Sequence, residues 1–181
     1  MIEALVAILI LSFGLLALGS FMAYGVQLPK LSGNRSVAMV AGADLVERMR
    51  ANSSGTLSYA NSTISGLTGN ATNTFTATFT VPTSMPTGST CAFANCTAAS
   101  LATMDVATVD FNLKRQLPSG GLTIQIPDTA NAPRIGNVWV IWQEPSNFGT
   151  FSTSGSDVCP ANVTAMSLSP APRCVYIPFR L

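Results

Sequence analysis

The sequence predicts an α+β fold in which a long N-terminal helix packs on a small antiparallel sheet. The run between Glu3 and Lys30 is apolar and uncharged, apolar residues recur at helical spacing as far as Met49, and three later segments alternate apolar and polar residues. The 181 residues are enough for one domain beyond the helix. We expect residues 1–29 to form a transmembrane helix, and residues 30–181 to form a head domain that includes the amphipathic half of the helix.

The first half of the helix is apolar on every face and long enough to cross a bilayer. Glu3 is the exception, because a charge in hydrocarbon costs at least ~2.5 kcal/mol. It is either the end residue of a plain membrane anchor or a residue with a functional role. A signal peptide would carry cationic residues ahead of a shorter apolar core, which this sequence lacks.

The second half is amphipathic, since Val37, Ala41, Leu45 and Met49 recur every four residues. We expect a kink or partial melting at Gly25 and Pro29, because proline removes a helix donor and clashes with the preceding turn. Two ion pairs at helical spacing, Asp44 with Arg48 and Glu47 with Arg50, should add tenths of a kcal/mol. The polar run from Asn52 to Gly55 should end the helix.

The remaining elements follow from periodicity. Residues 51–90 are predicted to be a connecting loop with one short strand over 74–81, limited by Pro82 and Pro86. A second helix is expected from Leu101 to Leu117, ended by the Pro118–Gly121 turn. Strands are expected over 122–126, 138–142 and 175–179, with one face of each strand packed on the amphipathic half of the first helix.

The four cysteines fall into two local pairs, Cys91 with Cys96 and Cys159 with Cys174. In a membrane-anchored, exported chain this spacing indicates two disulfides, although four cysteines allow three connectivities. A zinc site is disfavoured because the sequence has no histidine and no CxxC. The loop between Cys159 and Cys174 should bury little, so the bond should be what holds it to the last strand.

Composition argues against several classes of function. Charged residues make up 9% of the chain and the net charge is +1, which is unlike a nucleic-acid-binding protein. No histidine is present to act as a general base. The acids Asp105, Asp110, Asp128 and Asp157 are scattered without calcium-loop spacing. We therefore expect no enzyme, and no catalytic, cofactor or metal site.

The first residues, MIEALVAILILSFGLLAL, resemble the N-terminal helix of type IV pilins and type II secretion pseudopilins. In those families a prepilin peptidase cuts a short leader just ahead of the apolar helix. Met1 stands inside this motif, so we interpret the sequence as trimmed or mis-started there. The resemblance implies that Glu3 acts in assembly, by neutralising the N-terminal amine of an adjacent subunit in the filament core.

A second run, ADLVERMRANSSG at 43–55, resembles the PilV family of minor pilins. The cysteine-containing turn, the helix and the Leu-Pro-x-Gly-Gly run at 117–121 are similar to the same family, although Val109 stands where many members have tryptophan. The Cys159–Cys174 loop resembles the D-loop of pilins. The resemblance implies the type IV pilin fold, with the first helix packed on the sheet.

The implied function is priming of pilus assembly near the tip, which supports adhesion and twitching motility. The implied partners are other minor pilins, the major pilin, the tip adhesin, the inner-membrane assembly platform and the prepilin peptidase. The chain would wait in the inner membrane with its head in the periplasm, and then join the pilus fibre. The alternatives are a type II secretion pseudopilin and a membrane-tethered binding domain without an assembly role.

Overall fold

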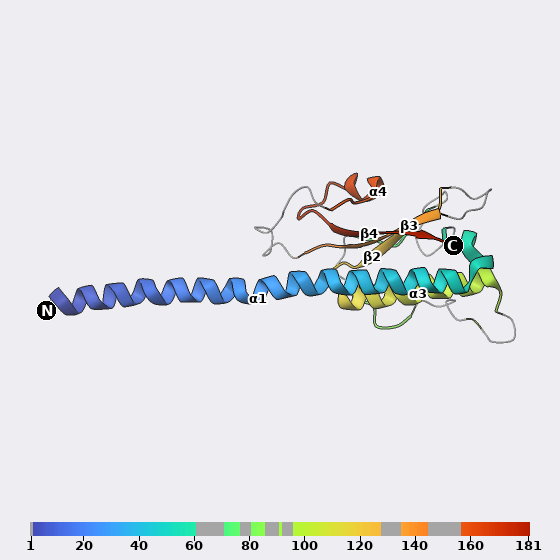
Figure 1. Ribbon diagram of the computed structural model, residues 1–181. Coiled ribbons are helices and arrows are strands. Elements are labelled where there is room, and N and C mark those ends of the chain that lie inside the picture. Colours follow the sequence, from blue (N-terminus) through green and yellow to red (C-terminus); the bar gives the residue numbers. More distant parts are fainter. Residues whose placement is uncertain are drawn as a thin grey trace. The chain divides into compact units, whose positions relative to one another are not determined.

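The computed structural model describes residues 2–60, 71–76, 81–85, 91, 96–127, 135–144 and 157–181, with only the backbone described at 23, 24, 26–28 and 71–73. The protein is α+β, with a long N-terminal apolar helix and a small antiparallel sheet (Figure 1). It forms two compact units, Met1–Arg35 and Ser36–Leu181, which we call the apolar unit and the head unit.

Helix α1 spans Ile2–Ala51 and contributes to both units. It is helical without interruption through Pro29, so partial melting at Gly25 and Pro29 is wrong, while the kink expected as its alternative stays a prediction. Pro29 removes only the bond to the carbonyl of the residue four positions earlier, and helical residues on both sides keep their own bonds. The expected end of the helix at Asn52 is confirmed.

The segment after α1 is more helical than predicted. A 3₁₀ turn, η1, covers Ser53–Gly55, and a short helix, α2, covers Thr56–Ala60. Thr56, Tyr59 and Ala60 are fully buried. A five-residue helix has too few residues to show a period, and burial of Tyr59 against the rest of the head unit accounts for its stability. The loop predicted from residue 51 is therefore wrong for 53–60.

Helix α3 spans Ala98–Gln116, close to the predicted bounds. Its N-cap is Thr97, whose hydroxyl accepts a hydrogen bond from the backbone N–H of Ser100 at 3.2 Å. Lys114 and Arg115 lie in the last turn of α3, where the helix dipole stabilises positive charge. Arg115 also lies over the ring of Phe111, with its guanidinium carbon 5.4 Å from the ring centroid.

Four antiparallel strands form the sheet in the order β1-β2-β3-β4. They span Ala71–Asn73, Gly121–Gln125, Ile135–Trp142 and Arg173–Arg180. The last three confirm the predicted strands. The strand predicted over 74–81 is wrong for Thr74–Thr76, which have no regular structure, while residues 77–80 lie outside the described residues. The short strand of this region, β1, lies at 71–73 instead.

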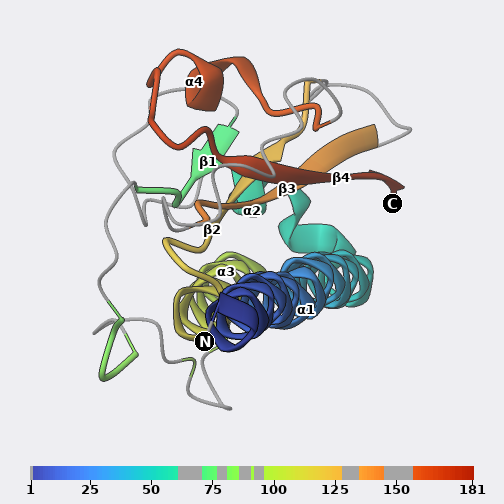
Figure 2. The ribbon, with the colours of Figure 1, turned by 90° about the vertical axis from the view of Figure 1, so that its left-hand side faces the viewer.

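One face of the sheet packs on two helices, as Figures 1 and 2 show for α3 and the second half of α1. The core joins residues of α1 and α3 to the alternating apolar residues of the strands: Leu45, Met49, Val106, Leu113, Leu122, Ile124, Val138, Val140, Val175 and Phe179. At Gly42, an added Cβ would meet Ile177 Cδ1 of β4 and would lie 3.2 Å from Val140 Cγ2 of β3, so α1 lies close against the sheet there. The prediction that the sheet packs on the amphipathic half of α1 is confirmed, and α3 completes the helical layer.

The opposite face of the sheet is also partly buried, although the alternation of apolar and polar residues along the strands predicted that it would be partly exposed. Trp139, Ile141 and Cys174 form a second apolar cluster with Phe75 and Val163. Val163 belongs to α4, the four-residue helix Ala161–Thr164, and is fully buried. Between Cys159 and Cys174 only Pro160 and Val163 are buried, so the expectation that this loop buries little is confirmed for most of it. Val163 is the exception and gives the loop an apolar anchor of its own.

Candidate functional site: the apolar helix and a polar network in the head unit

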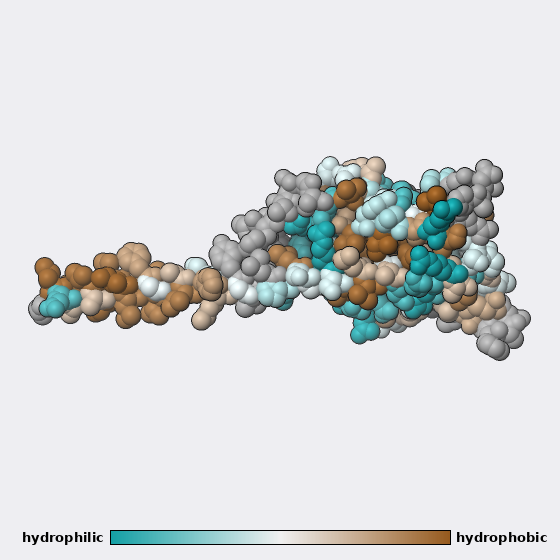
Figure 3. All heavy atoms as spheres, in the orientation of Figure 1, coloured by the Kyte–Doolittle hydropathy of each residue, from teal (hydrophilic) through white to brown (hydrophobic). Residues whose placement is uncertain are grey.

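The candidate site begins with the apolar part of α1. Ile2–Met22 is 21 residues long with a mean hydropathy of 2.5, and none of it is buried within the protein. Its large apolar side chains are between 54% and 81% exposed. Figure 3 shows the apolar residues following this half of the helix on the face in view. By length and composition the helix can cross a bilayer, and a signal sequence meets the same criteria.

The hydroxyl groups in this helix are satisfied locally. Ser12 donates to the carbonyl of Ile8 at 2.7 Å, and Ser20 donates to the carbonyl of Leu16 at 3.1 Å. Such bonds to the residue four positions earlier hide the hydroxyls from an apolar environment. The helix surface from Ala4 to Met22 therefore presents no hydroxyl that needs a partner from outside.

Glu3 lies exposed in the first turn of α1. The helix dipole favours a negative charge at this end. A carboxylate here can accept hydrogen bonds or pair with a cation, such as an amine, that approaches the end of the helix. The pairing partner implied by the resemblance belongs to another subunit, so the role of Glu3 remains a prediction.

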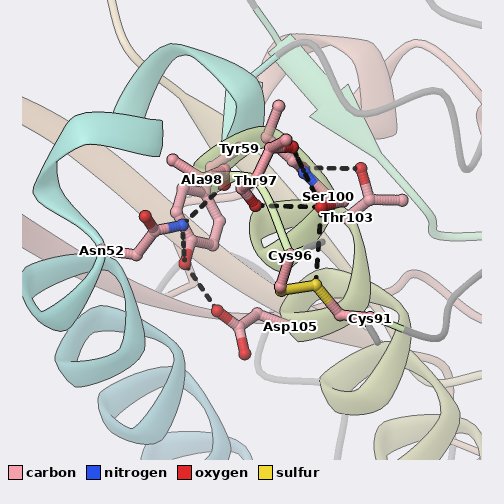
Figure 4. The surroundings of a disulfide bond; sticks show 10 residues. Asn52, Tyr59, Cys91, Cys96, Thr97, Ala98, Ser100, Thr103 and Asp105 are labelled. Carbon is pink, nitrogen blue, oxygen red and sulfur yellow. Dashed lines mark hydrogen bonds between the residues drawn. A yellow bond between two sulfur atoms is a disulfide. The ribbon is translucent and has the colours of Figure 1, made fainter. Parts of the chain in front are cut away.

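Where α1 ends, a buried polar network joins it to α2 and α3 (Figure 4). The hydroxyl of Tyr59 donates to Asp105 Oδ2 at 2.6 Å, and Arg48 Nη1 contacts Asp105 Oδ1 at 3.2 Å. Arg48 Nε also donates to Asp44 Oδ2 at 2.9 Å, which confirms one predicted ion pair. The amide of Asn52 donates to the carbonyl of Ala98 at 2.8 Å. The network fixes how the end of α1 meets the start of α3.

The environment of this network changes the acidity of two of its members. Burial raises the pKa of Tyr59, and the hydrogen bond to Asp105 raises it further, so the phenol keeps its proton as a donor. The hydrogen bond to Asp44 is the main cause that raises the pKa of Arg48. Both pKa shifts favour the protonated forms, the neutral phenol of Tyr59 and the charged guanidinium of Arg48, which donate the hydrogen bonds of the network.

Sequence reasoning missed this network because its members are far apart in the chain. Tyr59 fell in the predicted loop, and Asp105 was counted among the scattered acids. One signal was present: Asp105 lies among the buried positions of α3, between Ala102 and Val106, where a polar residue needs a partner. The predicted pair of Glu47 with Arg50 is confirmed.

The structure contains two disulfides, Cys91–Cys96 and Cys159–Cys174. Cys91 Sγ also lies 3.4 Å from the hydroxyl of Ser100, so the first disulfide contacts the opening turn of α3 (Figure 4). The second disulfide joins the segment before α4 to β4, and Arg173 beside it contacts Asp157 at 3.6 Å.

The acids that the sequence showed as scattered do not come together. Asp105 contacts Arg48, Asp110 contacts Lys114 at 2.8 Å, and Asp157 contacts Arg173. Asp128 lies outside the described residues. Within the part of the chain that the structure describes, no group of three His, Cys, Asp or Glu side chains is placed to hold a metal ion.

Comparisons of this chain with models of known protein families, with characterised proteins and with solved structures find no match.

Proposed function

We propose that this chain is a minor pilin of a type IV pilus, with the type IV pilin fold and a resemblance to the PilV family. One observation carries the proposal: an apolar helix with a single carboxylate in its first turn continues without interruption into an amphipathic half that packs on an antiparallel sheet. The exposed apolar half requires a bilayer or other apolar helices around it. In this proposal a membrane surrounds the apolar half first, and the apolar helices of a filament core surround it after assembly.

In this proposal Glu3 is an assembly residue. Its carboxylate pairs with the N-terminal amine of a neighbouring subunit, because a pair of opposite charges is far less costly in an apolar core than either charge alone. The head unit carries its own core and remains folded in both environments. The chain would wait in the inner membrane with its head in the periplasm and later enter the pilus fibre.

The proposed role is structural and not enzymatic. The chain would join other minor pilins in priming a pilus that the major pilin extends, with the tip adhesin, the prepilin peptidase and the inner-membrane assembly platform as further partners. Adhesion and twitching motility would depend on it through the number of pili. The disulfide-closed loop at Cys159–Cys174 and the DLVERMRAN run favour this role over a secretion pseudopilin.

Substitution of Glu3 tests the proposal. In cells that carry Glu3→Ala, we expect fewer surface pili and less of the chain in sheared pilus fractions, with the chain still present in the membrane. Pili are counted by electron microscopy, and the chain is followed by immunoblotting. Glu3→Asp is the matched control, because it keeps the charge and should retain most of the piliation.

Three results would count against the proposal. Normal piliation with Glu3→Ala would remove the charge-pairing role. A secretion defect with normal pili would indicate a pseudopilin. Absence of the chain from both sheared pili and the secretion apparatus would favour a membrane-tethered domain.

A further inference from the structure

The disulfide Cys91–Cys96 lies where another molecule can reach it. Cys96 is exposed and Cys91 is half-buried. Neither cysteine belongs to the two apolar clusters that the described residues form. The bond joins residues only five apart in sequence, and a short closed loop constrains the unfolded chain little. Breaking this bond therefore leaves the core of the head unit in place.

The sulfur of Cys91 lies beside a hydrogen-bond donor. The hydroxyl of Ser100, in the first turn of α3, lies 3.4 Å from Cys91 Sγ and 2.9 Å from the carbonyl oxygen of Thr97 (Figure 4). A disulfide sulfur is a weak acceptor, so the hydroxyl donates to the carbonyl. A thiolate at Cys91 would be a much stronger acceptor, and rotation of the hydroxyl would bring its hydrogen to the sulfur. The surroundings of Cys91 therefore stabilise a thiolate.

The second disulfide has the opposite surroundings. Cys174 is only 3% exposed and packs with Trp139 and Val163 in the apolar cluster on the outer face of the sheet. Cys159 Sγ lies 3.7 Å from the carbonyl oxygen of Pro172, which would repel a thiolate. Apolar surroundings also disfavour the charged form of a thiol. This bond is therefore shielded from attack, and its surroundings oppose a leaving thiolate.

We propose that Cys91–Cys96 is a redox-active disulfide that exchanges with a dithiol, whereas Cys159–Cys174 is structural. One thiolate of the dithiol attacks the exposed Cys96, forms a mixed disulfide and displaces Cys91 as a thiolate, which Ser100 stabilises. The second thiolate of the dithiol then attacks the dithiol's own sulfur in the mixed disulfide and releases Cys96. The dithiol loses two electrons and two protons, and the two cysteines gain them as thiols.

The inference goes beyond the proposed function and does not depend on it. The N-cap of α3 at Thr97 and the core contacts of α3 involve neither cysteine, so the reduced head unit stays folded. Reduction leaves an exposed thiol at Cys96, directly ahead of α3. The head unit would therefore gain a point of covalent attachment for a partner's thiol in reducing surroundings and lose it in oxidising ones.

Timed reduction of the full-length chain in detergent tests the inference. The oxidised chain is treated with dithiothreitol, quenched at intervals with N-ethylmaleimide and mapped by mass spectrometry. We expect Cys91 and Cys96 to be labelled at least about tenfold faster than Cys159 and Cys174. Circular dichroism recorded when only the first pair is labelled should match that of the oxidised chain.

Glutathione, a monothiol, identifies the sulfur that is attacked. It forms the mixed disulfide but has no second thiol to resolve it. After a brief exposure followed by N-ethylmaleimide, we expect glutathione on Cys96 and the maleimide label on Cys91.

Two variants test the role of the hydroxyl. Ser100→Ala removes the donor beside Cys91 Sγ and should slow the reduction of Cys91–Cys96 at least about threefold, without changing that of the second disulfide. Thr103→Ala is the matched control, because its hydroxyl also belongs to α3 but donates to the carbonyl of Ala99 at 3.2 Å. It should leave both reduction rates unchanged.

Three results would overturn the inference: equal reduction rates for the two disulfides, faster reduction of Cys159–Cys174, or loss of the circular dichroism signal as Cys91–Cys96 opens. Glutathione on Cys91 would refute the attack at Cys96, and equal rates for Ser100→Ala and Thr103→Ala would refute the role of Ser100. None of these measurements involves pili, so the inference and the proposed function stand or fail separately.

Discussion

Asp110 shows how a single side chain in α3 can make stability depend on pH. Its carboxylate is almost fully buried and contacts Lys114 Nζ at 2.8 Å. Its Oδ1 accepts no hydrogen bond from the described residues. Burial raises the pKa of Asp110 above its ordinary value of 3.8, although Lys114 opposes the shift. The folded protein therefore holds this proton more tightly than the unfolded chain does.

The sign of the pH dependence follows from that shift. The contribution of Asp110 to stability is fully present below pH 3.8 and is lost as the pH rises through the higher folded-state pKa. Asp110→Asn removes this titration. We expect the free energy of unfolding of the variant, relative to the unmodified protein, to increase between about pH 3.5 and pH 7. Urea denaturation of residues 30–181 at several pH values measures it.

Glu47→Gln is the control for Asp110→Asn, since it also removes one negative charge but from an exposed ion pair with Arg50. Its effect on the free energy of unfolding should stay small across the series. A constant difference between Asp110→Asn and the unmodified protein at every pH would contradict the assignment.

At the scale of elements, the two disulfides fasten different structures. Cys159–Cys174 joins residues 15 apart in sequence and ties the α4 segment to β4. Cys91–Cys96 joins residues five apart and lies against the first turn of α3. The α4 segment also has Val163, which is fully buried against the outer face of the sheet. The longer loop is thus held both by its bond and by apolar contact.

The chain-entropy model gives roughly 3 kcal/mol for the longer loop and roughly 2 kcal/mol for the shorter one. Cys159→Ser should therefore lower the melting temperature more than Cys96→Ser under non-reducing conditions. Differential scanning calorimetry of residues 30–181 compares the two variants. Peptide mapping must first show the two bonds, and a Cys91–Cys174 link or free thiols would contradict the expected pairing.

At the scale of the whole molecule, the two units need different surroundings. Among the described residues, the buried core of the head unit begins at Ala38. The apolar unit exposes its large apolar side chains along Ile2–Met22. The boundary predicted between residues 29 and 30 would separate a part of the chain that needs an apolar environment from a part that is stable in water. It stays a prediction, and a chain cut at this position tests it.

A chain that begins at Lys30 should be soluble and monomeric without detergent, because the apolar surface upstream has been removed. It should unfold in one cooperative transition, since the head unit has its own core. Sedimentation and urea denaturation measure both properties, with the full-length chain in detergent as the reference. Persistent aggregation of the shorter chain would mean that residues beyond 30 also need an apolar environment.

The sequence by itself determined the helices and strands in which apolar residues recur at a regular spacing. The apolar half of α1, its amphipathic half, α3, and the strands β2, β3 and β4 each repeat a pattern over enough residues to be recognised. The ion pairs Asp44–Arg48 and Glu47–Arg50 were predictable for the same reason, because helical spacing brings their side chains together. Glu3 stood out in the sequence as the only charge before Lys30.

The tertiary structure alone decided what depends on residues far apart in the chain. Helix α2 is too short to form without the burial of Tyr59, and β1 exists through its pairing with β2. Tyr59 and Asp105 meet across 46 residues, and Val37 and Val109 share a groove only because α3 turns back along α1. Periodicity reports which face of an element is apolar, whereas the partner of that face is chosen by how the elements pack.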